Sequence, residues 1–218
     1  MKIKLIYTLI IILSSAASGF AQIEKGSFML GGQAYYTKQN SRSGSNGLES
    51  TNKVNAGTFD VSAGYTIKNN QVLGIMVSYN SYKLNSNSNV IQTGSQNSKT
   101  KSIGTFYRIY HPLGNGFYLY GQAAATYSNR EETTTGGYNY TAHTNIGNLS
   151  LSPGISYEIF KNVQLELTIP NLVGISYSKS KGGLEEQTSV PTIESFSANT
   201  SLNNGILSNL GLGFKIFF

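Results

Sequence analysis

The chain has 218 residues, of which only 12% are charged, and its formal net charge is +6. That share of charged residues is about half of the roughly 25% found in soluble domains, yet only 39% of the residues are hydrophobic. The rest is largely Gly, Ser, Thr and Asn, with 15 Tyr. This composition excludes a helical bundle and an intrinsically disordered chain. The absence of Cys excludes disulfides, thiolate metal sites and lipid attachment to cysteine.

The first 21 residues have the order of a secretory signal peptide. Lys2 and Lys4 precede an apolar run from Leu5 to Leu13, and small residues follow up to Ala21. The apolar run is about half the length needed to span a membrane. We therefore expect cleavage between Ala21 and Gln22, which leaves a mature domain of residues 22–218 with a net charge near +4. No cluster of basic residues indicates nucleic acid as a partner.

From Ser27 onward the sequence repeatedly alternates apolar and polar residues with period two, the pattern of half-buried strands. The third segment, for example, places Leu73, Ile75 and Val77 on one face and Gly74, Met76 and Ser78 on the other. Eight such segments are predicted, near residues 27–37, 54–67, 71–84, 100–110, 117–128, 144–159, 163–178 and 203–218.

The predicted connections alternate between short and long. The links at 68–70, 111–116 and 160–162 are short, whereas those at 38–53, 85–99, 129–140 and 179–200 are long and polar. Short turns at one end and long loops at the other are typical of transmembrane β-barrels of the outer membrane. The predicted fold class is therefore all-β: an eight-stranded antiparallel up-and-down barrel, with short periplasmic turns, long extracellular loops and both chain ends on the periplasmic side.

Aromatic residues on the predicted outward faces fall at two levels, with aliphatic residues between them, as the two interfaces of a bilayer select. A closed sheet also leaves no unpaired backbone in lipid. Near the periplasmic ends lie Phe28, Tyr65, Tyr107, Phe117, Tyr157, Phe214 and Phe218, and near the loop ends lie Tyr36, Tyr79, Tyr127 and Tyr177.

Two prolines interrupt the sixth and seventh segments. A three-residue turn would place Pro153 opposite Ile169 and Pro170 opposite Ser152. Because proline donates no ladder hydrogen bond, the sequence predicts a bulge or break here, with Asn171 marking a shift of register. The alternative is a lateral opening between these two strands for a lipid-soluble ligand.

Strand parity directs five charged side chains into the lumen. An eight-stranded barrel is just wide enough to be filled by side chains, and buried charges must be paired. We therefore expect a structural ion network that plugs the lumen. The residues are Asp60, Arg108, Glu158, Glu166 and Lys215.

The chain resembles the small outer-membrane β-barrel domain proteins of Gram-negative bacteria, particularly those of the Bacteroidetes type. The resemblance lies in the strand pattern, in the first segment Lys25–Gly32 and in the last segment Gly213–Phe218. The resemblance implies outer-membrane lipid as surroundings and recognition by the barrel-assembly machinery during biogenesis. The alternating C-terminal series is similar to the assembly signal of these families. Its residues are Leu210, Leu212, Phe214, Ile216 and Phe218.

The sequence offers few groups for catalysis. Its two histidines, His111 and His143, are expected in a turn and a loop, and neither begins the His-x-Ser pair of outer-membrane lipid A deacylases. We predict no catalytic residues, cofactor or metal, and a monomer whose surface loops bind or shield, with an unidentified extracellular ligand. The alternatives are a lipid-modifying outer-membrane enzyme and, less favoured, a soluble lipocalin-like ligand-binding barrel, which would need its apolar face inward.

Overall fold

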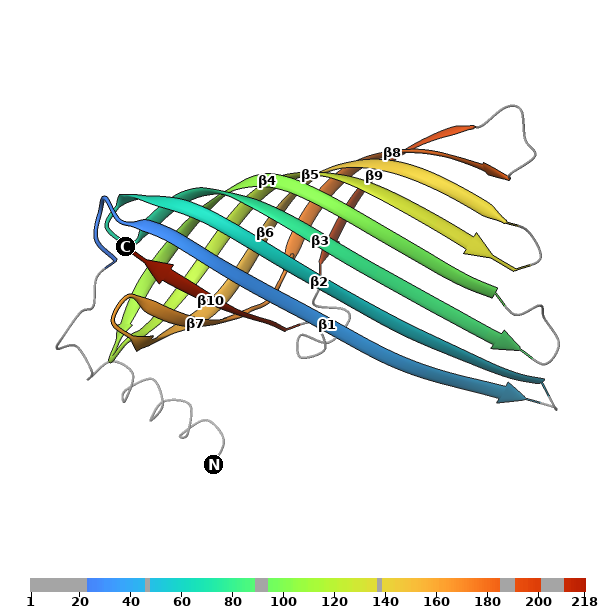
Figure 1. Cartoon of the computed structure of the whole chain (residues 1–218), viewed down its shortest axis with the longest axis horizontal. Helices are drawn as coiled ribbons and strands as arrows, with labels where there is room; N and C mark the ends of the chain where they lie inside the picture. The colour runs from blue at the N-terminus through green and yellow to red at the C-terminus, as the bar shows by residue number, and fades with distance from the viewer. Residues whose placement is uncertain (1–22, 46–47, 89–93, 137–138, 185–190, 201–209) are drawn as a thin grey trace.

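The computed structural model describes residues 23–45, 48–88, 94–136, 139–184, 191–200 and 210–218. Within these residues the chain forms ten antiparallel strands and no helix (Figure 1). The strands are β1 (Phe28–Ser45), β2 (Leu48–Lys68), β3 (Gln71–Ser88), β4 (Gly94–Gly114), β5 (Phe117–Thr135), β6 (Tyr140–Phe160), β7 (Val163–Thr168), β8 (Val173–Leu184), β9 (Thr192–Thr200) and β10 (Gly211–Phe217).

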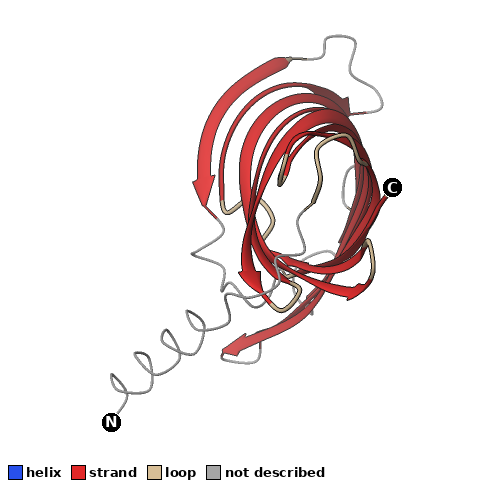
Figure 2. Cartoon of the chain, turned by 90° about the vertical axis from the view of Figure 1, so that its left-hand side faces the viewer, coloured by secondary structure: helices blue, strands red, loops and turns tan. Residues whose placement is uncertain are grey.

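Eight of these strands close into a ring, which Figure 2 shows nearly end-on. Strands β1 to β7 follow one another around the wall, and β10 closes it by pairing with β7 on one side and β1 on the other. Strand β8 continues the line of β7 along β6, and β9 pairs with β8. The predicted all-β, up-and-down barrel is confirmed.

The ring is strongly staggered. A row of paired residues that starts at Leu119 on β5 and follows the ladders around the barrel returns to β5 at Asn129, ten residues further along the strand. A stagger of this size in an eight-stranded barrel corresponds to strands tilted by about 40° from the barrel axis. The row runs through Ile155, Leu167, Leu212, Ala34, Phe59, Tyr79 and Lys101.

One of the eight predicted strands is divided, and another is described only in part. The predicted strand 163–178 is β7 followed by β8, with a break between them. Of the predicted strand 203–218, the structure shows β10, and residues 203–209 lie outside the described residues. Strand β9, at residues 192–200, was predicted as part of a loop, which is wrong.

The predicted long loops are also largely wrong, because most of their residues belong to strands. Strands β1 and β2 remain paired as far as Ser45 and Leu48, and β4 and β5 as far as Ser95 and Thr135. These extensions are rich in Ser, Thr and Asn on both faces. Their backbone ladder continues, but no apolar alternation marks it, since neither face carries a continuous set of apolar side chains.

The short turns are tight, and asparagine sets their geometry. Asn70, Asn115 and Asn162 have φ values of 63°, 50° and 66°, in the left-handed region that favours Asn and Gly in two-residue hairpins. The turn predicted at 111–116 shrinks to Asn115–Gly116, because β4 extends to Gly114.

The predicted break at the prolines is confirmed. Gly154 pairs with Thr168 and Leu151 with Val173, so two residues of β6 face the four residues 169–172. Asn171 takes a φ of 48° within this bulge. The strands stay joined: Ile169 N donates to Pro153 O at 2.9 Å, and Asn171 N donates to Ser152 Oγ at 3.0 Å. The alternative of a lateral opening between these strands is therefore wrong.

The outer face of the wall carries the apolar side chains, and the inner face is mostly polar. Leu73, Ile75 and Val77 are 50%, 61% and 51% exposed. The predicted aromatic residues lie on this outward face, from Phe28 and Phe218 at the short-turn end to Tyr36 and Tyr177 toward the other. This distribution is the reverse of that of a soluble ligand-binding barrel. No helix in the described part of the chain is long and apolar enough to cross a membrane.

Candidate functional site in the lumen

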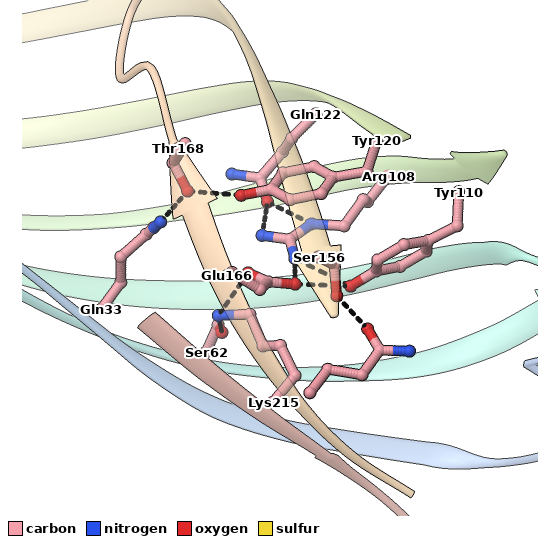
Figure 3. Close-up of polar contacts among 11 residues, drawn as sticks. Gln33, Ser62, Arg108, Tyr110, Tyr120, Gln122, Ser156, Glu166, Thr168 and Lys215 are labelled. Atoms are coloured by element: carbon pink, nitrogen blue, oxygen red, sulfur yellow. Dashed lines mark hydrogen bonds and ion pairs between the residues drawn. The ribbon is translucent and has the colours of Figure 1, made fainter. Parts of the chain in front are cut away.

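An ion network lies inside the ring, toward the short-turn end. Arg108 on β4 reaches across the lumen to Glu166 on β7, and Nη1 of the arginine lies 2.5 Å from Oε1 of the carboxylate (Figure 3). Both side chains are almost completely buried. Because β4 and β7 stand on different sides of the ring, this ion pair bridges the lumen.

The guanidinium of Arg108 is held by three further groups. Its Nε and Nη2 donate to Oε1 of Gln122 at 2.9 and 2.7 Å, and Nη1 donates to the Tyr110 hydroxyl at 2.8 Å. The ring of Tyr120 lies beneath it, with the centroid 4.4 Å from the guanidinium carbon, a distance at which a cation and an aromatic face attract. These contacts orient the arginine toward Glu166.

Glu166 also interacts with a second cation. Tyr110 donates to Oε1 at 3.0 Å, while Lys215 Nζ on β10 lies 3.7 Å from Oε2. That Oε2 atom is buried and accepts no hydrogen bond. Lys215 Nζ also donates to Ser62 Oγ at 3.3 Å. Gly31 opposite makes room, since a Cβ there would collide with the lysine side chain.

Aromatic rings close the barrel below the network. Tyr110 packs edge-on against Tyr118 and Phe217, with ring centroids 6.0 and 6.1 Å apart. Other members of this buried cluster are Ile23, Met29, Val72 and Phe106. Ile23 N donates to Asn70 Oδ1 at 3.1 Å, which ties the start of the described chain to the β2–β3 turn. The short-turn end of the lumen is thus filled with side chains.

Two of the five predicted residues, Asp60 and Glu158, form no ion pair with Arg108, Glu166 or Lys215. Asp60 is buried higher in the lumen, where it accepts hydrogen bonds from Ser78 and Tyr35. Glu158 does not join the network: its Oε1 accepts from Asn162 N at 3.2 Å, in the β6–β7 turn. Parity predicted the inward direction of Glu158, but the residue lies too near the strand end to reach Glu166.

On the other side of the network the lumen widens into a cavity of about 660 Å³, called here the vestibule. Gln33, Asp60, Gln122 and Thr168 are among its lining residues, and Gln122 also contacts Arg108 of the network. Its lining is mainly hydroxyl and amide side chains, with Asp60 and Arg130 as charged members among the described residues. Examples from four strands are Thr58, Ser78, Ser102 and Ser128. The vestibule is therefore a largely polar space inside the ring.

The two histidines lie apart on the wall and are both exposed. His111 pairs in register with Leu119 near the end of β4, and His143 on β6 faces Glu131 and Lys181. The described residues contain no group of three His, Cys, Asp or Glu side chains placed to bind a metal ion.

The C-terminal series closes the ring. Phe218 N donates to Phe28 O at 2.9 Å, and Phe28 N donates to Phe218 O at 3.1 Å. Leu212, Phe214 and Phe218 are exposed on the outer face, and Ile216 and Leu210 are partly exposed. Ala21 and Gln22, the predicted cleavage site, lie outside the described residues.

The architecture of this chain is similar to that of solved outer-membrane proteins. The outer membrane protein OprG from Pseudomonas aeruginosa matches 89% of this chain and 97% of its own, with a TM-score of 0.52 at 12% identity. Neisserial surface protein A matches 89% and 100%, with a TM-score of 0.45 at 20% identity. This chain has the fold of an outer-membrane β-barrel. No protein-family profile and no curated protein matches the sequence.

Sequence reasoning missed the uncharged partners of the network. Tyr110, Tyr120 and Gln122 orient Arg108, whereas the predicted network contains only charged residues. The signal was present: Tyr110 has the same strand parity as Arg108, and Tyr120 and Gln122 lie inward on the neighbouring strand. A buried arginine has five donors to satisfy, so inward acceptors on adjacent strands are the residues to seek.

Proposed function

We propose that the protein is an integral outer-membrane β-barrel without enzymatic activity, with a plugged lumen and an extracellular half that binds or shields. The observation that carries this proposal is the inverted wall, apolar outside and polar inside, on a closed ring. A lipid environment tolerates a sheet only when its backbone is fully paired. A soluble lipocalin-like carrier would have the opposite polarity.

The plug rests on the network and the aromatic layer beneath it. Arg108, Glu166 and Lys215 come from three strands and are nearly inaccessible to solvent. The vestibule ends at this floor, so the lumen holds ligands or water from one side without conducting them. The binding surfaces are the polar strand extensions and the vestibule, in place of the long loops expected from the sequence.

Cell fractionation and bilayer recording test the two parts of the proposal. The protein is expected in the outer-membrane fraction, released by detergent and not by osmotic shock, and to migrate differently on gels with and without heating. In planar bilayers it should give no discrete conductance steps. Release by osmotic shock would refute the membrane location, and regular conductance steps would refute the plug.

A further inference from the structure

The outer wall carries a group of basic residues on β1 to β4, called here the basic patch. Residues Thr37, Thr58, Asn80 and Thr100 line the vestibule and so mark the inward positions of these four strands. The alternate positions point outward, and all the basic residues of this region occupy them. The patch consists of Lys38, Arg42, Lys53, Lys83, Lys99 and Lys101, each exposed.

The strand register brings these side chains together. Lys38 and Lys83 both pair with Asn55, and Lys53 lies two residues from Asn55 on the same face of β2. On the next strand, Lys99 pairs with Ser81, two residues from Lys83. Diagonal neighbours of this kind are about 7–8 Å apart, within reach of long side chains. The patch is therefore continuous across four strands.

The patch has no acidic residue within it. At the outward positions of 36–42, 51–57, 79–87 and 95–103, all described, neither Asp nor Glu occurs. At the edge of the patch, Lys99 pairs in register with Glu131 on β5. On the opposite wall, Lys179 Nζ lies 2.9 Å from a Glu194 oxygen. The other five basic residues of the patch pair in register only with uncharged residues.

The patch lies directly beyond the apolar band. Tyr36 and Tyr79 are the last outward aromatic residues of β1 and β3, and Lys38 and Lys83 follow them by two and four residues. Lysine side chains at such a level extend their charge toward lipid head groups. Outward side chains at this level extend from the barrel wall toward the surrounding lipid. There, the phosphate groups of the lipid head groups are the nearest anions.

We infer that the basic patch binds the phosphate groups of lipids in the outer leaflet. This inference rests on the proposed membrane location. Ammonium and guanidinium groups form charge-assisted hydrogen bonds with phosphate oxygens, and six cations on one face suit a head group with more than one phosphate. The patch binds anionic lipid on the side of the barrel formed by β1 to β4, and the side formed by β5 to β9 carries no such patch among its described residues.

The test compares two triple variants that each remove three positive charges. Lys53→Gln/Lys83→Gln/Lys99→Gln lies in the patch, and Lys25→Gln/Lys68→Gln/Lys161→Gln lies at the short-turn end, where all three lysines are exposed. Each protein is refolded into phosphatidylcholine vesicles with or without a bisphosphorylated glycolipid. After detergent extraction and purification, the retained glycolipid is measured by mass spectrometry, and folding is checked by heat-modifiability.

The patch variant should retain roughly tenfold less glycolipid than the unmodified protein, while the control variant retains a normal amount. Lys53→Arg/Lys83→Arg/Lys99→Arg should retain it normally, and salt should lower retention by the unmodified protein. Equal retention by both Gln variants overturns the inference. Binding of inorganic polyphosphate by the same variants is measured in parallel. If the patch variant loses polyphosphate binding but retains lipid normally, the patch binds a soluble polyanion, and the inference is overturned too. Failure of the unmodified protein to fold into phosphatidylcholine alone would refute the membrane location first.

Discussion

Arg108 and Glu166 form a nearly inaccessible ion pair across the lumen, with 2.5 Å between Nη1 and Oε1. Bulk water solvates neither charge, so each is stabilised by the other and by the surrounding hydroxyl and amide groups. Removing one partner leaves the other buried and unpaired, which costs more than the pair itself contributes. The barrel is therefore expected to be sensitive to single substitutions at this level.

Replacing Glu166 with Ala should destabilise the folded barrel by about 3–5 kcal/mol, because Arg108 and Lys215 would remain as buried cations without a counter-charge. Urea unfolding in lipid vesicles measures the change. Glu194→Gln, which breaks the exposed ion pair with Lys179, is the control and should have little effect. Similar losses for both variants would contradict the buried network.

A charge on the outer wall should be worse than one in the lumen. Val77 is half-exposed on the apolar band, and Ser78 lines the vestibule. Val77→Arg should cost about 2–4 kcal/mol, the price of arginine near the middle of a bilayer, whereas Ser78→Arg enters a polar space beside Asp60. Refolding yield into vesicles, followed on gels, separates them. A larger loss for Ser78→Arg would contradict the assigned orientation.

Gly211 is needed because the ring of Tyr35 occupies the place of its side chain. A Cβ at position 211 would collide only with atoms of that ring among its nearest neighbours. Gly211→Ala should therefore cost about 1–3 kcal/mol by overpacking, and Tyr35→Ala should relieve the clash. A double-mutant cycle on unfolding free energies measures this coupling. Additive effects of the two substitutions would show that the ring can move aside.

The bulge beside β7 depends on a left-handed residue. Asn171 has a φ of 48°, which Gly adopts freely and β-branched residues avoid. Asn171→Gly should leave stability nearly unchanged, whereas Asn171→Val should cost on the order of 1–3 kcal/mol. Both are compared by urea unfolding. If Val is tolerated as well as Gly, the backbone at 171 does not hold the conformation seen here.

Deletion of Phe218 should lower the heat-modifiable fraction in outer membranes. Its backbone exchanges two hydrogen bonds with Phe28, and its ring is 67% exposed at the end of the apolar series. Phe218→Ala keeps the backbone pair and removes the ring, so it separates closure of the sheet from recognition of the terminus. Normal amounts of folded protein after the deletion would argue against an assembly signal.

The sequence predicted those parts of the fold in which one face of a strand is apolar. Apolar alternation located the portions of the wall that carry the apolar outer band, and Pro153 and Pro170 located the bulge. It failed where strands such as β9 and the ends of β1 and β2 leave the apolar band, because water on both faces removes the alternation while the backbone stays paired. In the lumen, parity placed Arg108, Glu166 and Lys215 on the inner face. Parity does not give the position of a side chain along the barrel axis, so it also predicted Glu158 as a member of the ion network.

The shortness of β10 bears on how the ring comes together. This strand shares six ladder positions with β1 and six with β7, whereas β1 and β2 share eighteen. The pairs between β1 and β10 join residues almost a whole chain apart, so they carry the largest loop-closure entropy of any ladder in the barrel. Strand β10 therefore makes the entropically costliest connection of the ring through a short ladder. Without β10, strands β1 to β7 form an open sheet whose two edges are β1 and β7, so the pairing of β10 with both of them completes the barrel.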